Sequence, residues 1–413
     1  MNPHQMSGIE GFQSTLTGVR VLDLTQFEAG PSCTEVLAWL GADVVKVENP
    51  KGGDPGRSTG AKPGKDGRWF VLLNANKRSI TVDLKTTAGV DLIKDMAREA
   101  EVFVENFGPG TIERLGLGYD EIRAINPKIV YAQIKGFGPG SPFEANLALD
   151  TIGQASGGSM SVTGERGGRP LRPGPSIADT GSGMLLTIGI LAALHRCKKE
   201  GRGARIEVAM QDAVMQYIRG AFSEHERTGK AAPRAGTKSA AVINVPSDIY
   251  PCSPGGPNDY VYIYPHRGNP QHWQRLLEII ERPDLKGDER FETPGARGQN
   301  EAEVDAMISA WTRRHDKYEA ARLIGAAGIP AGPVMDTMDL ENDPTFEQRG
   351  IMQMVEHPSH GRFKMLSWPV RCDGLAPTIR PAPLLGEHTT EVLTDWLGLD
   401  ADDIKRMRAD KIV

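Results

Sequence analysis

The chain has 413 residues, enough for two domains, and its 39% hydrophobic and 24% charged residues are typical of a globular protein with a large core. A net charge of -5 and the lack of a Lys/Arg-rich block give no electrostatic basis for a nucleic-acid partner. The longest apolar run, residues 184–194, is too short to cross a bilayer, so no membrane partner is expected.

Two further features concern location and metal binding. Residues 1–8 lack the basic start and apolar centre of a signal peptide. The cysteines, Cys33, Cys197, Cys252 and Cys372, form no C-x-x-C pair, and the nine histidines are dispersed. We therefore expect a reduced, cytoplasmic location, with no disulfide framework and no metal site.

The N-terminal part predicts a strand–helix–strand unit, with strands at 18–25 and 42–48 and a helix at 32–40. Such a unit forms a right-handed crossover in a parallel sheet. The turn 26–31 holds one glycine where a dinucleotide fingerprint needs three. The pattern therefore predicts a Rossmann-like sheet without NAD chemistry.

More alternating elements follow. Residues 228–260 are rich in small residues, Pro and Gly, which predicts a crossing between domains. Further strands are expected at 79–84, 102–105, 128–134, 205–210, 260–264, 352–356 and 363–366. Helices are expected at 87–100, from 111, at 213–226 and from 389, and a helical segment is expected to begin at 272–281 and to continue to about 327.

One carboxylate, Asp179, stands between a glycine-rich loop (173–184) and the apolar run 185–194. Its residue type and position allow two interpretations: an N-cap of the following helix, or a reactive group facing a cleft. From the local residues alone the cap is favoured. Asp150 is a second acidic candidate, and an N-cap role for 151–155 is favoured there too.

Four cations, Lys46, Lys85, Arg114 and Lys135, fall near predicted strand ends or helix starts. Singly each is an ordinary solvated charge, but together on one sheet edge they would suit a polyphosphate ligand. His388 could serve as a functional imidazole, although a surface or capping role is favoured.

Taken together, these residues resemble one family closely, the class III CoA-transferases of the formyl-CoA:oxalate CoA-transferase type. The matching blocks follow one another in order over nearly the whole chain, at 22–31, 40–48, 74–85, 104–116, 178–184, 201–205, 211–214 and 383–388. The resemblance implies an α/β fold with a large Rossmann-like domain formed by 1–226 and 346–413. A smaller α+β domain, 227–345, would be inserted between these parts, and two chains would interlock as rings in a homodimer.

By the same resemblance, Asp179 would be the catalytic nucleophile, which reverses the preference for a cap. Its carboxylate would attack an acyl-CoA thioester and pass through an aspartyl anhydride and an aspartyl-CoA thioester. Glycine-rich backbone near Asp179 could stabilise the oxyanions. CoA would be a substrate, with no permanently bound cofactor, and the acceptor a small carboxylic acid, by analogy a dicarboxylate. The implied CoA contacts are Glu28, Ala29, Asn49, Val82, Asp83, Leu84, Lys85, Asn106, Phe107, Gly108 and Arg114.

Several positions depart from the formyl-CoA:oxalate pattern, namely Glu28, Asn49, Thr59, Leu149 and a missing run of four glycines near 240–246. These departures spare the nucleophile and concern specificity for oxalate and formate. A racemase of 2-methylacyl-CoA esters shares the implied fold, but it needs a His directly before Asp150, where this chain has Leu149. A non-enzymatic CoA-binding protein is a third alternative, and Asp179 in its glycine-rich loop argues against it.

Overall fold

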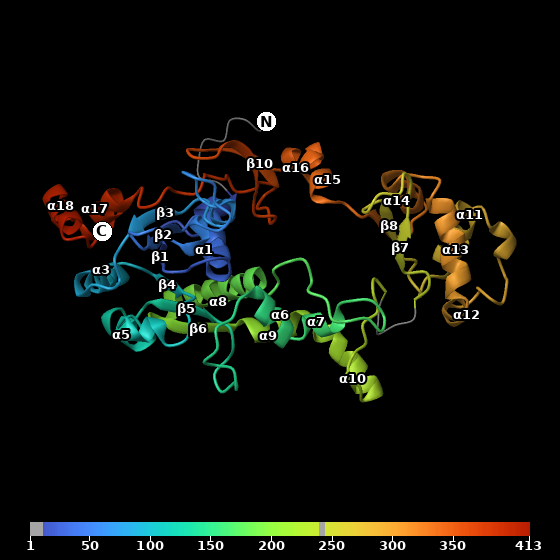
Figure 1. Ribbon diagram of the computed structural model, residues 1–413, viewed down its shortest axis with the longest axis horizontal. Helices are drawn as coiled ribbons and strands as arrows, with labels where there is room; N and C mark the ends of the chain where they lie inside the picture. Colours follow the sequence, from blue (N-terminus) through green and yellow to red (C-terminus); the bar gives the residue numbers. More distant parts are fainter. Residues whose placement is uncertain (1–10, 239–243) are drawn as a thin grey trace. The chain divides into compact units, whose positions relative to one another are not determined.

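The computed structural model describes residues 11–238 and 244–413, which form two compact units (Figure 1). The first unit comprises Met1–Ser159, Pro173–Tyr217 and Pro344–Val413, and the second Met160–Arg172 and Ile218–Asp343. The predicted domain boundaries stay a prediction; the compact units differ from them mainly in placing 160–172 and 218–226 in the second unit. Residues 1–8 and part of 240–246, which entered the expectations about a signal peptide and a glycine run, lie outside the described residues.

Six parallel strands form the centre of the first unit, in the order β3-β2-β1-β4-β5-β6. Each overlaps a predicted strand, so the prediction of an α/β fold with a parallel sheet is confirmed. The strands are β1 (Arg20–Asp23), β2 (Asp43–Glu48), β3 (Arg78–Thr81), β4 (Val102–Glu105), β5 (Val130–Lys135) and β6 (Ala204–Ala209).

Side chains of the central strands alternate between two buried layers, because successive residues of a strand point to opposite faces. Val21 and Val102 belong to one layer, while Leu22 and Phe103 belong to the other. Helices cover both faces, as expected for a parallel sheet. The first layer packs against α1 (Ala29–Trp39) and α8 (Asp179–Glu200), and the second against α3 (Thr87–Arg98), α5 (Tyr119–Ile125), α17 (Thr389–Leu397) and α18 (Ala401–Ala409).

The closest helix contact in the sheet's first layer joins α1 to α8. A Cβ atom on Gly183 would lie 2.6 Å from the carbonyl oxygen of Ala29 and 3.1 Å from the nitrogen of Cys33. Only glycine permits that approach, which places the first turns of the two helices beside each other. The sequence of α8 therefore has to provide a glycine at position 183 for packing, in addition to Asp179 at its start.

The prediction of one continuous helix at 213–226 is wrong. The segment contains α9 (Met210–Tyr217), a 3₁₀ turn at Arg219–Ala221 and α10 (Phe222–Thr228). Gly220 lies in the turn, where its high conformational entropy weakens a continuous helix. The break also coincides with a boundary between the two compact units, because Tyr217 ends the middle segment of the first unit and Ile218 begins the longer segment of the second.

The second unit contains a three-stranded antiparallel sheet and a group of helices around its own buried cluster. The strands of this sheet are β7 (Asp248–Pro251), β8 (Tyr260–Ile263) and β9 (Ala331–Pro333). The helices are α11 (Pro270–Ile279), α12 (Pro294–Gln299), α13 (Glu301–Thr312), α14 (Lys317–Ala326) and α15 (Thr337–Asn342).

The first unit also contains shorter elements outside the six-stranded sheet. They are α2 (Arg68–Leu72), α4 (Thr111–Arg114), α6 (Asp150–Ser156), α16 (Pro344–Gln348) and the hairpin of β10 (Met352–His357) and β11 (Gly361–Leu366). Helix α7 (Ser159–Val162) starts at the border of the two units. In the part of the chain that is described, no helix combines the length and apolar character that a membrane span requires.

A fully buried set of charged groups connects β1, α1 and the residues before β3. Lys77 lies 3.2 Å from an Asp23 carboxylate oxygen, and Glu35 accepts the backbone N–H of Ala75 at 2.9 Å. Burial raises the pKa of Glu35 to about 8, against the opposing effects of Lys77 and the Ala75 N–H. Burial also raises the pKa of Asp23, but the nearby Lys77 and Lys46 charges outweigh it and leave that pKa below its ordinary value.

We predict that Glu35 makes folding pH-dependent. Its pKa is raised in the folded state, so this group's stabilisation is complete below about pH 4.5 and is lost as the pH rises through about 8. Glu35→Gln keeps an oxygen for the Ala75 N–H and removes the titration. The stability of the variant relative to the native chain should therefore increase by about 1 kcal/mol or more between pH 6 and pH 9, as measured by urea unfolding. The exposed Glu289→Gln variant should show no such trend, and a constant difference for Glu35→Gln would contradict the prediction.

Candidate active site

A cavity of about 410 Å³ opens at the carboxyl edge of the six-stranded sheet. Its lining comes from the segments after three neighbouring strands, residues 26–29 after β1, 106–109 after β4 and 134–136 at the end of β5. The strand order changes direction between β1 and β4, and ligands of open α/β sheets bind at such a point. The remaining lining residues are Asn146, Leu147, Ala148, Leu149, Ile152, Asp179 and Met210.

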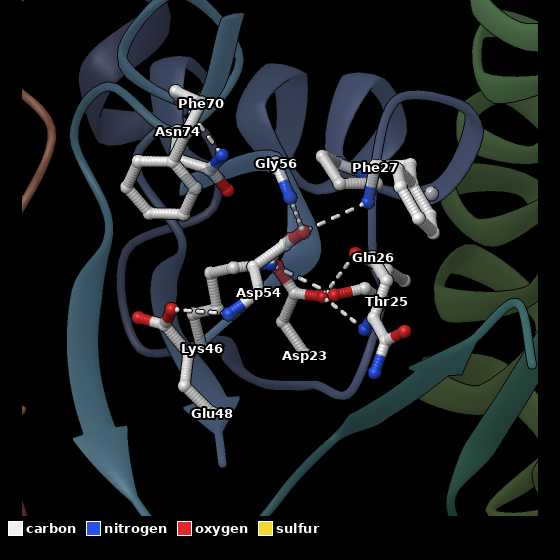
Figure 2. A network of polar contacts seen from close by, with 12 residues as sticks. Asp23, Thr25, Gln26, Phe27, Lys46, Glu48, Asp54, Gly56, Phe70 and Asn74 are labelled. Atoms are coloured by element: carbon white, nitrogen blue, oxygen red, sulfur yellow. Dashed lines mark hydrogen bonds and ion pairs between the residues drawn. The ribbon is translucent and has the colours of Figure 1, made fainter. Parts of the chain in front are cut away.

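The turn after β1 is held in an uncommon conformation by a buried carboxylate. Phe27 has φ 62°, in the left-handed region that costs a non-glycine residue about 1–2 kcal/mol. Its N–H donates to Asp54 Oδ1 at 3.1 Å, and the same oxygen accepts the N–H of Gly56 at 2.8 Å. Figure 2 shows Asp54 between these two backbone groups.

Lys46 connects this carboxylate to the end of β1. Its ammonium group lies 2.8 Å from Asp54 Oδ2 and donates to the carbonyl oxygen of Thr25 at 2.8 Å. Burial lowers the pKa of Lys46, but Asp54, Asp23 and Glu48 outweigh this effect and raise it above its ordinary value. The interpretation of Lys46 as part of a phosphate site is therefore wrong, because the side chain is completely buried and already paired.

A second pair of contacts ties the turns after β1 and β4 together. The Asn106 side chain accepts the N–H of Gln26 at 2.8 Å and donates to the Gln26 carbonyl at 2.9 Å. These reciprocal bonds reproduce a strand-like pairing beyond the ends of the strands. Asn106 therefore fixes the distance between two walls of the cavity.

Lys135 and Glu105 shape the third wall. Lys135 lies 2.8 Å from Glu105 Oε1 and donates to the carbonyl oxygen of Phe107 at 2.9 Å, while Glu105 accepts the N–H of Phe107. Burial raises the pKa of Glu105, although Lys135 opposes the rise. Lys135 alone, of the four predicted cations, lines the cavity.

Two acidic residues, Glu28 and Asp179, reach the cavity from the starts of α1 and α8. Glu28 Oε1 accepts the hydroxyl of Thr180 at 2.8 Å, which joins the two helix starts. Asp179 is the first residue of α8, and Ala178 occupies the N-cap position without a side-chain cap. The interpretation of Asp179 as an N-cap is therefore wrong.

The N-cap prediction for Asp150 is also wrong. Asp150 is the first residue of α6, after Leu149 in the N-cap position. Its Oδ1 accepts the N–H of Ala178 at 3.1 Å and that of Asp179 at 3.4 Å, so it serves the start of another helix. Leu149 lines the cavity next to it.

Only some of the expected CoA contacts line the cavity: Glu28, Ala29, Asn106, Phe107 and Gly108. The others also follow carboxyl ends of strands, or in the case of Arg114 end the nearby α4, but they lie outside the lining. Asn49, Lys85 and Arg114 are exposed, Asp83 and Leu84 are half-buried, and Val82 is buried. Asp83 accepts the N–H of Lys85 at 3.0 Å, and Arg114 donates to the hydroxyl of Thr111 at 2.9 Å.

Outside this site, His388 links the C-terminal segment to β3, through backbone and ring contacts with Ser79 at 2.9 and 3.3 Å.

Gly181 and Gly183 lie inside α8, and a Cβ on Gly181 would come 2.6 Å from the Tyr217 ring. Both glycines therefore serve close packing, and the expectation that glycine-rich backbone near Asp179 supplies oxyanion donors stays a prediction. Across residues 11–238 and 244–413, no group of three or more His, Cys, Asp or Glu side chains could hold a metal ion.

The sequence alone missed several residues that shape the cavity, including Gln26, Asp54, Thr180 and Met210. Asp54 acts on Phe27, which lies 27 positions away in the chain, and Thr180 on Glu28, 152 positions away. The one available signal was Asp54 before Pro55, a common start of a short turn. That signal indicates local structure and carries no information about Phe27.

The fold defines an α/β protein with a cavity at the switch point of a Rossmann-type sheet, the place where open α/β sheets bind ligands. The model of the CoA-transferase family III matches residues 16–389. The chain is 39% identical to a formyl-CoA:oxalate CoA-transferase of Streptomyces avermitilis, over 96% of this chain and 99% of the relative. It is 37% identical to a Rhodopseudomonas palustris protein of the same name, over 93% of both chains.

Two solved structures are similar over nearly the whole chain. A CAIB/BAIF family protein from Brucella suis has a TM-score of 0.81 at 30% identity, covering 92% of this chain and 99% of that one. A Mycobacterium tuberculosis protein in an orthorhombic crystal form has a TM-score of 0.77 at 30% identity, covering 91% and 98%. The chain belongs to the CoA-transferase family III, so the predicted resemblance is confirmed and the protein is a CoA-transferase.

We predict that Lys46→Met destabilises the fold strongly, because it leaves the Asp54 and Asp23 carboxylates buried without this cation. Removing one partner of a buried ion pair costs about 3–5 kcal/mol. Urea unfolding at pH 7 should show a loss of that size. Lys51→Met, an exposed lysine in the next loop, should change the free energy of unfolding by less than about 0.5 kcal/mol. A similar small effect for Lys46→Met would show that the pair does not hold the turn.

Proposed function

We propose that this CoA-transferase moves CoA from an acyl-CoA thioester to a small free carboxylic acid, with Asp179 as the nucleophile. The observation that carries the proposal is the position of Asp179, which lines the cavity from the first residue of α8. A carboxylate is ionised at pH 7 and needs no base to activate it. The matching of the family model across 16–389 supports the same assignment.

The proposed reaction proceeds in two symmetrical halves. An Asp179 oxygen attacks the donor's thioester carbonyl and releases CoA thiolate, which leaves an aspartyl–acyl anhydride. The thiolate then attacks the aspartyl carbonyl, so that the donor acid leaves with one Asp179 oxygen and an aspartyl-CoA thioester remains. The acceptor carboxylate reverses both steps, which yields the new acyl-CoA and returns an oxygen to Asp179. Covalent catalysis thus divides one difficult exchange into easier ones.

Each tetrahedral intermediate in this sequence needs hydrogen-bond donors for its oxyanion. The start of α1 supports such a role, because the first N–H groups of a helix have no acceptor within the helix. Ala29 is the first residue of α1 and lines the cavity with Asp179. We therefore propose backbone donors from this turn as well as from the glycine-rich backbone near Asp179.

A small dicarboxylate is the proposed class of acceptor. The Streptomyces and Rhodopseudomonas relatives that support this class are named formyl-CoA:oxalate CoA-transferases. The racemase alternative receives no support, because Leu149 occupies the position that would need an imidazole base.

For CoA itself we propose contacts by Glu28, Ala29 and 106–108 within the cavity, and by Asn49, 82–85 and Arg114 along the same sheet edge. Lys85 and Arg114 are exposed cations and would bind the phosphates. On the resemblance we also propose that CoA is a substrate with no permanently bound cofactor, and that the chain works in the cytoplasm as an interlocked homodimer.

We predict that Asp179→Asn lowers the transferase kcat by at least a thousandfold, because the neutral amide cannot form the anhydride. With formyl-CoA or succinyl-CoA as donor, hydroxylamine should convert Asp179 of the native enzyme to the hydroxamate, detected by peptide mass spectrometry. The same treatment should leave the Asp179→Asn peptide unmodified. Wild-type turnover by the variant, or a hydroxamate on another residue, would disprove the assignment.

We predict that Arg114→Ala and Lys85→Ala raise the KM for the CoA thioester with little change in kcat. A hydrogen bond to a charged group contributes about 1.5–3 kcal/mol, so the rise should be roughly 10- to 100-fold. Lys128→Ala is the matched control, because this exposed lysine precedes β5 at the opposite edge of the sheet. Equal effects of the three substitutions on KM would refute a phosphate role for Lys85 and Arg114.

A further inference from the structure

The start of α8 receives its cap from a different helix. The carboxylate of Asp150, at the beginning of α6, is 7% exposed and accepts the N–H groups of Ala178 and Asp179 through Oδ1. The opening N–H groups of a helix lack intrahelical acceptors and form the positive end of its dipole. A carboxylate therefore satisfies them in both hydrogen bonding and charge.

Ala178, the N-cap residue of α8, cannot cap the helix with its own side chain. It occupies the N-cap position with φ -76° and ψ -41°, and it has no side chain that could accept a hydrogen bond. The following Thr180 N–H donates to the carbonyl oxygen of Ser176 at 2.9 Å. Asp150 thus performs the task of an N-cap residue, and the Asp179 backbone is bonded directly to it.

Asp150 is itself fixed by its surroundings. Gln154 donates to Asp150 Oδ2 at 2.7 Å and to the carbonyl oxygen of Pro175 at 3.0 Å, so it ties the carboxylate to the loop before α8. A Cβ on Gly153 would come 2.7 Å from the Cβ of Ala178, which shows how closely α6 approaches this point. Two independent contacts therefore hold α6 against the residues that carry Asp179.

We propose that Asp150 is a positioning residue for the transferase reaction. By binding the backbone N–H of Asp179, it fixes the direction in which the Asp179 carboxylate enters the cavity. The proposal rests on the proposed function, because it takes Asp179 as the nucleophile. Small displacements of a reacting group are expensive, since a shift of about 1 Å can cost about 100-fold in rate.

The test compares Asp150→Ala with Asp150→Asn in steady-state transferase assays. Asp150→Ala should lower kcat about 10- to 100-fold, with the KM for the CoA thioester nearly unchanged. Asp150→Asn keeps an oxygen for the two N–H groups. Its side-chain NH2 can donate to the Gln154 carbonyl oxygen if the Gln154 amide turns over, which gives up the Gln154 bond to Pro175. This variant should recover most of the lost kcat.

Asp316→Ala is the matched control for loss of a helix cap. Asp316 Oδ1 accepts two backbone N–H groups, those of Tyr318 and Glu319, at the start of α14 in the second unit. This substitution should lower Tm and leave kcat unchanged. Native kcat in Asp150→Ala, or an equal loss of kcat in the Ala and Asn variants, would overturn the proposal.

Two further variants separate the possible failures. If Asp150→Ala does not fold, Gln154→Leu releases Asp150 Oδ2 and should still lower kcat severalfold; native kcat in that variant overturns the proposal. Asp179→Asn is assayed alongside. An active Asp179→Asn would refute the proposed function, whereas an inactive Asp179→Asn together with a native-like Asp150→Ala would refute only the role of Asp150.

Discussion

The cavity depends on one buried ion pair, that between Lys46 and Asp54. Lys46 fixes the carbonyl of Thr25, and Asp54 holds the N–H of Phe27, so both sides of the turn after β1 are tied to β2 and its following loop. The left-handed conformation of Phe27 costs about 1–2 kcal/mol. Breaking a buried pair costs about 3–5 kcal/mol, so the pair can maintain the strained turn from which α1 begins.

That turn determines where two helix starts meet. Gly183 lets α8 approach the first turn of α1, and Thr180 donates to Glu28 across the junction. Asp150 binds the N–H groups at the start of α8, a task that an N-cap side chain commonly performs. Asp179 therefore follows the cap position, and its carboxylate lines the cavity. The framework of the site lies in contacts between elements that are distant in sequence.

The sequence predicted the sheet well, because buried parallel strands appear as short apolar runs such as those containing Val21 and Val102. The family blocks predict Asp179 as the nucleophile, although its local pattern indicates a cap; the structure places Asp179 in the cavity lining, and the catalytic role stays a prediction. The sequence singled out Asp150 as an acidic candidate but could not reveal that it binds the N–H of Asp179, 29 positions away. The predicted phosphate role of Lys46 fails for a similar reason, because the sequence near a strand end does not indicate that the Asp54 carboxylate pairs with this lysine. Close helix packing is one reason for the glycines beside Asp179, and their expected role as oxyanion donors stays a prediction.

The central claim is that Asp179 forms covalent intermediates, and an isotope experiment tests it most directly. In a single turnover with an acceptor acid labelled with heavy oxygen in its carboxylate, the mechanism returns one acceptor oxygen to the enzyme. Mass spectrometry should then find one heavy oxygen in the peptide that contains Asp179, and none in the released donor acid. Label in the donor acid during the first turnover, with none in that peptide, would mean direct attack of the acceptor on the donor and would contradict the role of Asp179.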